Sequence, residues 1–350
     1  MSDSADAPEA LESAAQEADS DAVEPLATSL DDIEAITASL PAAGQRLDVH
    51  ALVEAWRKLA LRCAGFQREP KAEGFDAWIK RLDADLLTLF ENETDRSLLL
   101  LVFSAGSSAE GYSANHSLLV CMSCELSARQ LGWDDDRRKS LRRAALTMNI
   151  AMFQLQNQLA LQADPLSDEQ RATIDEHEAQ GVSKLRELGV SDDIWLQAVE
   201  NHHQVAAGDL FSMEPGLQVA RLIQRADLMT ARLSVRRSRD SLSGTLAAKS
   251  AYFDENEKPD AAGAALIKSL GIYPPGTYVT LASGETAVVV SRGASANKPT
   301  VAAITNSSGM PHHTPVLRYT DHKLYAVTSS LARKEFNVRT AIESLLRLAD

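Results

Sequence analysis

Apolar residues recur every three to four positions along most of the chain, a spacing that places them on one face of an α-helix. Residues 46–107 carry two such stripes, one around Trp56 and one around Trp78, and predict an N-terminal helical region. The same period continues through residues 108–270 and predicts a run of further helices. The chain is therefore expected to be mainly α-helical.

The period changes after Gly271. A Pro-Pro-Gly turn precedes a stretch of alternating β-branched residues, a Ser-Gly turn and a second such stretch, which is the pattern of a β-hairpin. Residues 298–305 (KPTVAAIT) predict a third strand, and residues 338–349 (VRTAIESLLRLA) predict a closing helix. Residues 271–350 are thus predicted to form β-strands plus a closing helix.

The net charge of −14 is unevenly distributed. Residues 1–45 hold eleven Asp and Glu and no Lys or Arg, and this composition predicts a disordered acidic tail. The remaining 35 basic and 49 − 11 = 38 acidic residues leave a net charge of −3. A folded part so nearly balanced has no general positive field for nucleic acid, so DNA is not an expected partner.

The longest apolar run, residues 97–106, is too short to cross a bilayer, and no secretory signal precedes the helices, so a cytoplasmic location is expected. Three cysteines, an odd number, argue against a disulfide framework. Cys121 and Cys124 form a C-x-x-C within a helical pattern that offers no further ligands nearby, so both are predicted to be small core residues.

Four of the eight histidines lie in the central helical region, followed by an aspartate. The five residues are one or two predicted helices apart, a spacing that lets side chains converge inside a bundle. Imidazole and carboxylate groups are ligands of divalent metals, so the set is a candidate metal site. The alternative for each histidine is an ordinary hydrogen-bonded or exposed residue. The candidates are His116, His177, His202, His203 and Asp227.

Residues 142–161 (RRAALTMNIAMFQLQNQLAL) are predicted to form one helix. From Ala144 to Phe153 the only polar residues are Thr147 and Asn149. A buried amide must find hydrogen-bond partners, which makes an asparagine in so apolar a stretch unusual.

Five segments occur in an order that resembles the HD-GYP family, over residues 110 to about 305. That resemblance implies an HD-superfamily helical bundle at residues 108–270, with an N-terminal helical extension and a small C-terminal β-hairpin or three-strand segment. The family comprises bacterial metal-dependent phosphodiesterases that hydrolyse cyclic di-GMP. The segments are YSANHSLLV (112–120), LSDEQRATIDEHEAQGVSKLRELG (166–189), AVENHHQ (198–204), ARLIQRADLMTARLS (220–234) and LGIYPPGTYVTLASGETAVVVS (270–291).

The chain departs from the family pattern at its name-giving residues. The His-Asp pair falls on Met148 and Asn149, the following lysine falls on Met152, and no Gly-Tyr-Pro follows the paired histidines. A neutral amide is a poor bridge between two cations, and a thioether is a soft ligand. We therefore expect a degenerate site in which the five candidates are remnant ligands. The Asn149 amide is expected to bond His116 or Asp227, or alternatively a backbone carbonyl.

A basic stretch that also includes Arg239 follows Asp227, and the resemblance implies that it lies near substrate phosphates. Arginine forks suit phosphate oxygens, but a solvated helix end is the alternative. The candidate phosphate-binding residues are Arg232, Arg236 and Arg237.

The leading hypothesis is a signalling protein, catalytically impaired, that acts in cyclic di-GMP-related regulation by binding the nucleotide or a partner such as a diguanylate cyclase. The alternative is a metal-dependent phosphodiesterase with residual activity, in which His177, His202 and His203 hold one divalent Fe, Mn or Zn ion. A third hypothesis is a scaffold that binds no nucleotide.

Overall fold

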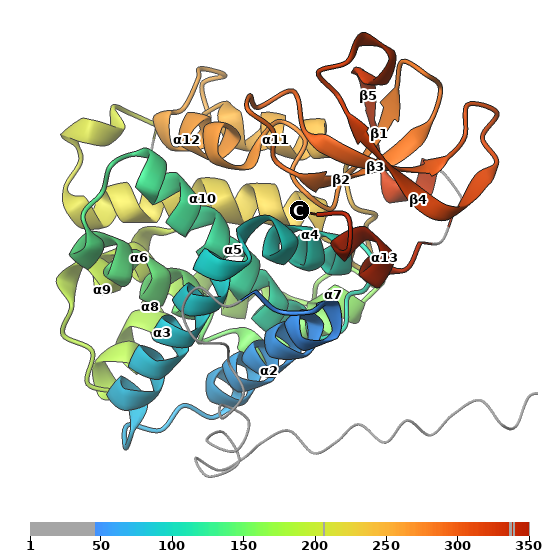
Figure 1. The fold of residues 1–350 in the computed structure, drawn as a ribbon. Coiled ribbons are helices and arrows are strands. Elements are labelled where there is room, and N and C mark those ends of the chain that lie inside the picture. The colour runs from blue at the N-terminus through green and yellow to red at the C-terminus, as the bar shows by residue number, and fades with distance from the viewer. Residues whose placement is uncertain (1–45, 206, 336–337, 339, 350) are drawn as a thin grey trace, which may run out of the picture.

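The computed structural model describes residues 46–205, 207–335, 338 and 340–349. Helices fill most of this part, and a five-stranded antiparallel sheet lies at the C-terminal end (Figure 1). The predicted mainly helical class, with a small C-terminal β segment, is confirmed. The predicted acidic tail, residues 1–45, lies outside the described residues.

The first three helices correspond to the predicted N-terminal helical region. Their apolar stripes belong to the same hydrophobic core as the helices that follow. The Phe66 ring stacks on Trp78 at 3.6 Å between centroids, and Trp56 donates to Ser97 Oγ at 2.9 Å. The division into domains stays a prediction. The helices are α2 (Val49–Arg68), α3 (Phe75–Asn92) and α4 (Thr94–Ala105).

The central bundle begins with a long buried helix, α5, against which α6, α10 and α12 pack (Figure 1). A capping box starts α8, in which Ser167 and Gln170 each accept a hydrogen bond from the other's backbone N–H. The helices of this region are α5 (Tyr112–Gln130), α6 (Asp135–Thr147), α7 (Phe153–Leu161), α8 (Asp168–Glu187), α9 (Asp193–Asn201), η1 (Leu210–Ser212), α10 (Pro215–Leu233), α11 (Gly244–Tyr252) and α12 (Ala261–Leu270).

The prediction of a single helix over residues 142–161 is wrong, because two separate helices cover this range. Helix α6 ends at Thr147, and α7 starts at Phe153. In between, the N–H of Ile150 donates to the Thr147 carbonyl and the N–H of Met152 to the Asn149 carbonyl, so the chain makes tight turns rather than α-helix. Residues 148–152 are called the interhelical turn below.

The sheet has strand order β4-β3-β2-β1-β5. The predicted hairpin is β1 with β2, and the predicted third strand is β3. Two edge strands were not predicted, because they are largely exposed and lack alternating apolar residues. The elements are β1 (Tyr278–Leu281), β2 (Thr286–Ser291), β3 (Thr300–Thr305), β4 (Pro311–Tyr319), η2 (Lys323–Tyr325), β5 (Val327–Leu331), η3 (Arg333–Glu335) and the closing helix α13 (Ile342–Leu346).

Cys121 and Cys124 are fully buried free thiols on α5, as predicted. Burial raises the pKa of both thiols well above its ordinary value, so neither is a reactive thiolate at neutral pH. Among the helices of the described residues, none is both long and apolar enough to traverse a bilayer.

A buried ionic network joins three helices. Arg142 of α6 donates to Asp83 of α3 at 2.5 and 3.1 Å, and to Glu125 of α5 at 2.9 Å. All three side chains are less than a tenth exposed. Charged side chains so deeply buried are stable only when each is paired with an opposite charge. The network therefore fixes how the three helices pack.

Replacing Arg142 by methionine should therefore destabilise the fold by about 3–5 kcal/mol, because the buried carboxylate of Asp83 loses its cation and that of Glu125 keeps only Arg129 and Arg138. Urea unfolding followed by circular dichroism measures the change. Lys80→Met is the control, since Lys80 and Asp76 form an exposed pair and its loss should cost about 1 kcal/mol or less. Equal costs for the two variants would contradict the structural role of the network.

Candidate metal centre

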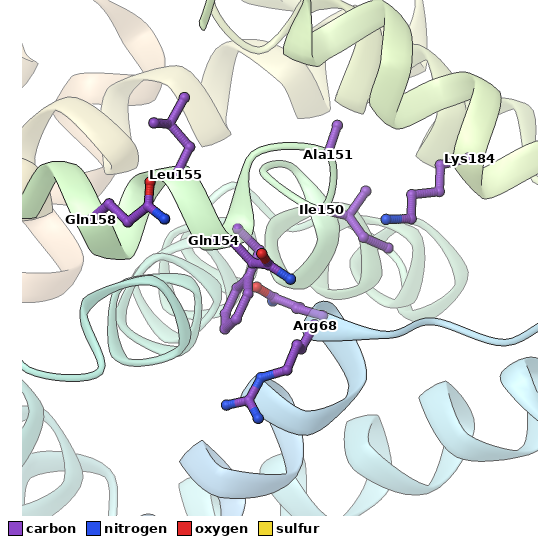
Figure 2. Close-up of a pocket in the computed structure, with 9 residues that line it drawn as sticks. Arg68, Ile150, Ala151, Gln154, Leu155, Gln158 and Lys184 are labelled. Atoms are coloured by element: carbon purple, nitrogen blue, oxygen red, sulfur yellow. The ribbon is translucent and has the colours of Figure 1, made fainter. Parts of the chain in front are cut away.

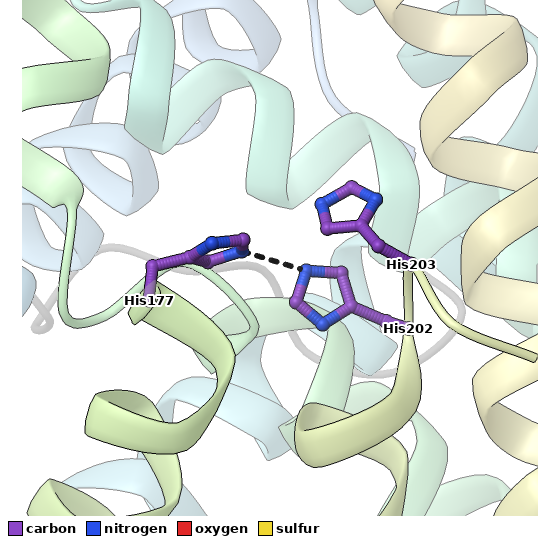
Figure 3. A group of neighbouring side chains, drawn as sticks. All are labelled: His177, His202 and His203. Atoms are coloured by element: carbon purple, nitrogen blue, oxygen red, sulfur yellow. Dashed lines mark hydrogen bonds between the residues drawn. The ribbon is translucent and has the colours of Figure 1, made fainter. Parts of the chain in front are cut away.

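Three of the predicted site residues come together where α8 meets the end of α9. His177 lies in α8, His202 follows the last residue of α9, and His203 is next to it (Figure 3). One ligand nitrogen from each ring can be chosen so that all three lie within 4.8 Å of one another. His177 and His202 are buried, whereas His203 is exposed. The cluster thus has a closed side and an open side.

The hydrogen bonds of the two buried rings fix their tautomers. Nδ1 of His177 lies 2.5 Å from the Ile174 carbonyl, and Nδ1 of His202 lies 2.8 Å from the Val199 carbonyl. A carbonyl oxygen only accepts, so both Nδ1 atoms carry protons. In neutral rings both Nε2 atoms are then lone-pair acceptors. They nevertheless face each other at 3.3 Å, the contact drawn in Figure 3.

Two facing lone pairs need a cation between or beside them. A proton is disfavoured, because burial lowers the pKa of both rings, to about 3 for His202, with the neighbouring histidines adding to the effect. Two nitrogens bound at about 2.05 Å to one tetrahedral ion would lie about 3.3 Å apart, the separation seen here. The donor set therefore fits a divalent transition metal, with each Nδ1 proton bonded as metal-bound histidines require.

Glu178 holds the open side in position. Its carboxylate, from α8, accepts from the backbone N–H of His203 at 2.9 Å and from Gln204 Nε2 at 2.6 Å. These two bonds anchor the end of α9 to α8. Glu178 was not predicted from the sequence, although a carboxylate directly after a candidate ligand, His177, could have indicated a supporting role.

The other two predicted ligands form a pair of their own. His116 Nε2, from α5, lies 2.6 Å from Asp227 Oδ1, from α10. His116 Nδ1 is buried and has no hydrogen-bond partner in the described part of the chain. Burial would raise the pKa of Asp227, but the hydrogen bond and charge of His116 hold it well below its usual range. The charge of Asp227 also acts on His177 and His202, so this pair and the histidine cluster are neighbours.

Only one of the predicted phosphate-binding arginines reaches this pair. Arg236 donates to the Tyr112 hydroxyl at 2.6 Å with its guanidinium 4.6 Å from the ring centre, and Tyr112 stacks on His116 at 5.2 Å. Arg232 is half-buried at the end of α10, and Arg237 is exposed. The sequence analysis missed Tyr112, which precedes His116 by one helical turn.

The three positions predicted to be degenerate all lie in the interhelical turn and are buried. Met148, Asn149 and Met152 are 0%, 4% and 8% exposed. The Asn149 Oδ1 atom has no hydrogen-bond partner among the described residues. The expected bond from Asn149 to His116 or Asp227 is not observed among the described residues, although His116 Nδ1 also lacks a partner there. The turn is a buried segment with an unsatisfied amide.

The fold can be compared with known structures. Bd1817, an HDG"Y"P protein from Bdellovibrio bacteriovorus, has a similar structure with a TM-score of 0.51, 16% sequence identity, and coverage of 67% of this chain and 76% of that chain. No family model and no curated protein matches the sequence. At this identity the likeness concerns the fold, which is distantly HD-GYP-like.

The lowered pKa of His202 predicts that the metal-free protein loses folding stability as the pH falls. The folded pKa of His202, about 3, lies below its unfolded value near 6.5, so only the unfolded chain takes up this proton as pH falls from 6.5 towards 3. Chelator-treated protein should lose roughly 2 kcal/mol of stability from His202 alone between pH 7 and pH 5. Urea unfolding at both pH values measures this.

His202→Gln is the matched variant for that measurement, since glutamine does not titrate. It should lose correspondingly less stability between the two pH values. A variant with the same pH dependence as the parent would show that His202 is not the buried neutral group described above.

Proposed function

We propose that the chain is a signalling protein with a degenerate HD-GYP-like domain, which holds a single divalent metal ion and binds a cyclic dinucleotide such as cyclic di-GMP without hydrolysing it efficiently. His177, His202 and His203 would hold the ion. The observation that carries the proposal is the pair of Nε2 atoms facing each other at 3.3 Å with both Nδ1 protons already bonded. Such a pair supplies two ligands of a metal coordination sphere.

The surroundings of this centre support one ion rather than two. Binuclear sites depend on anionic bridges, because two cations at short range repel each other. Asn149 is neutral, and Asp227 already accepts a short hydrogen bond from His116. A lone ion with one exposed histidine ligand keeps an open position that can accept a phosphate oxygen.

Nucleotide binding rests on the groups beside the centre. The Arg236 guanidinium lies over the Tyr112 ring and donates to its hydroxyl, so the ring and the hydroxyl together hold the cation in place. A preorganised guanidinium suits a phosphodiester oxygen. Regulation would follow from binding, either of the nucleotide or of a partner such as a diguanylate cyclase.

A residual phosphodiesterase is the second candidate. It is favoured by the exposure of His203, which leaves solvent access to the centre, and by the nearby His116–Asp227 pair. A bound metal would supply Lewis-acid polarisation of a phosphoryl oxygen. His116 and Asp227 could then hold or accept a proton at the His116 ring.

Metal content tests the core of the proposal. Purified protein incubated with Fe²⁺, Mn²⁺ or Zn²⁺ and then desalted should retain about one ion per chain by elemental analysis. His202→Gln should retain at least tenfold less, because it removes a buried ligand. His313→Gln is the control, since His313 lies outside the centre, on β4. Parent protein that retains no metal refutes the metal centre.

Calorimetric titration with cyclic di-GMP tests whether the protein binds the nucleotide. The metal-loaded parent should bind it, and Arg236→Gln should bind about tenfold more weakly through loss of a charge-assisted bond. Arg186→Gln, an exposed arginine on α8, is the matched control. A parallel hydrolysis assay separates the two candidates, because steady turnover by the parent would favour the phosphodiesterase. A silent titration would leave only the scaffold hypothesis.

Restoring the family residues tests the alignment. The triple variant Met148→His, Asn149→Asp, Met152→Lys should bind more metal per chain than the parent, since it returns an anionic bridge and an imidazole. Circular dichroism verifies that the buried turn tolerates the changes. A folded triple variant with the parent's metal content would mean that these three positions do not face the centre.

A further inference from the structure

A second cavity lies on the side of the interhelical turn where α7 begins. Its volume is about 320 Å³, within the range of small-molecule sites. Residues from the end of α2, the interhelical turn, α7 and α8 surround it (Figure 2). The lining residues are Gln67, Arg68, Ile150, Ala151, Phe153, Gln154, Leu155, Gln158 and Lys184.

The cavity is cationic in an acidic protein. Arg68 and Lys184 line it, and none of its nine lining residues is acidic. Neither cation has an ion-pair partner within the described part of the chain. Several buried cations of the bundle do have one, such as Arg142 and Arg221. Two cations without an ion-pair partner around one cavity that has no acidic lining residue favour an anionic occupant.

The start of α7 adds hydrogen-bond donors to these charges. Its N-cap residue, Met152, makes no side-chain cap, and the first bond into the helix is from Gln156 to the Met152 carbonyl. The backbone N–H groups of Phe153, Gln154 and Leu155 therefore have no intrahelical partner, and all three residues line the cavity. Free N–H groups at the positive end of a helix bind anions, phosphate above all.

Gln67 provides an independent sign of a ligand. This side chain is 2% exposed and lines the cavity. Its Nε2 donates to the Leu146 carbonyl at 2.5 Å, but its Oε1 has no hydrogen-bond partner among the residues that the structure describes. A buried carbonyl oxygen without a donor costs free energy, so the occupant should carry an N–H or O–H group as well as a negative charge.

We propose that this cavity binds a small phosphate monoester whose organic part carries a hydroxyl or amino group. The phosphate lies at the start of α7 between Arg68 and Lys184, and the hydroxyl or amino group donates to Gln67 Oε1. Among anions, a phosphate matches this site because it offers several acceptor oxygens and up to two charges to three N–H groups and two cations.

The site is separate from the candidate metal centre but shares its framework. Lys184 follows His177 on α8 by seven residues, or about 10 Å along the helix axis. Ile150 and Ala151 line the cavity, whereas Met148 and Asn149 of the same turn do not. A ligand here would fix the turn that carries the degenerate positions, whether or not a metal binds at the histidines.

Isothermal titration of chelator-treated, full-length protein tests the site, with chloride used to match ionic strength. Inorganic phosphate and ribose 5-phosphate are the probes. Both should bind the parent, and Arg68→Gln or Lys184→Gln should each weaken binding about tenfold. Arg186→Gln, an exposed cation on α8 outside the cavity, and His202→Gln should bind as the parent does. Arg68 is exposed and Lys184 half-buried, so both variants should fold.

Methyl phosphate isolates the contribution of Gln67. Having no hydroxyl or amino donor on its organic part, it should bind about tenfold more weakly than ribose 5-phosphate. Absence of phosphate binding to the parent, or equal loss in Arg186→Gln, overturns the site. Loss of binding in His202→Gln would show that phosphate binds at the histidine cluster instead. Equal affinity for methyl phosphate and ribose 5-phosphate would overturn the role of Gln67.

Discussion

The bonds from the Nδ1 atoms of two buried histidines to backbone carbonyls of their own helices constrain this molecule more than any other contact near the site. They fix both tautomers and direct two lone pairs at each other across 3.3 Å, in a place where burial opposes a proton. The surrounding architecture serves this geometry. The α8–α9 packing sets the distance, Glu178 fixes the following residues, and Asp227 supplies negative charge nearby without entering the cluster.

The interhelical turn is a buried break between two helices that is filled by adaptable side chains. Met148 and Met152 are buried, and methionine adapts to irregular gaps. Asn149 keeps the size of an aspartate but leaves its oxygen unsatisfied. Because the helix is broken here, α7 begins without a side-chain cap, and its first three residues line the cavity that also holds Arg68 and Lys184.

The charged groups divide into those that hold the fold and those that remain available. Arg142 and Arg221 are buried and satisfied by carboxylates from other elements, and they join helices that are distant in sequence. Arg68 and Lys184 are not matched in this way. Both of them line one cavity that has no acidic lining residue, which leaves their charge available to a ligand.

The sequence by itself determined the helical class, the hairpin and third strand, the buried cysteines and the set of histidines worth examining, since each follows from local periodicity, turn residues or residue chemistry. The sequence did not reveal the edge strands β4 and β5. Each pairs on one side only and has no buried residue, so neither needs alternating apolar residues. Only the tertiary structure decided that residues 142–161 break in the middle, that His116 bonds Asp227, and that three of the five candidates converge. Those outcomes depend on packing between helices far apart in the chain, which a local pattern of residues does not encode.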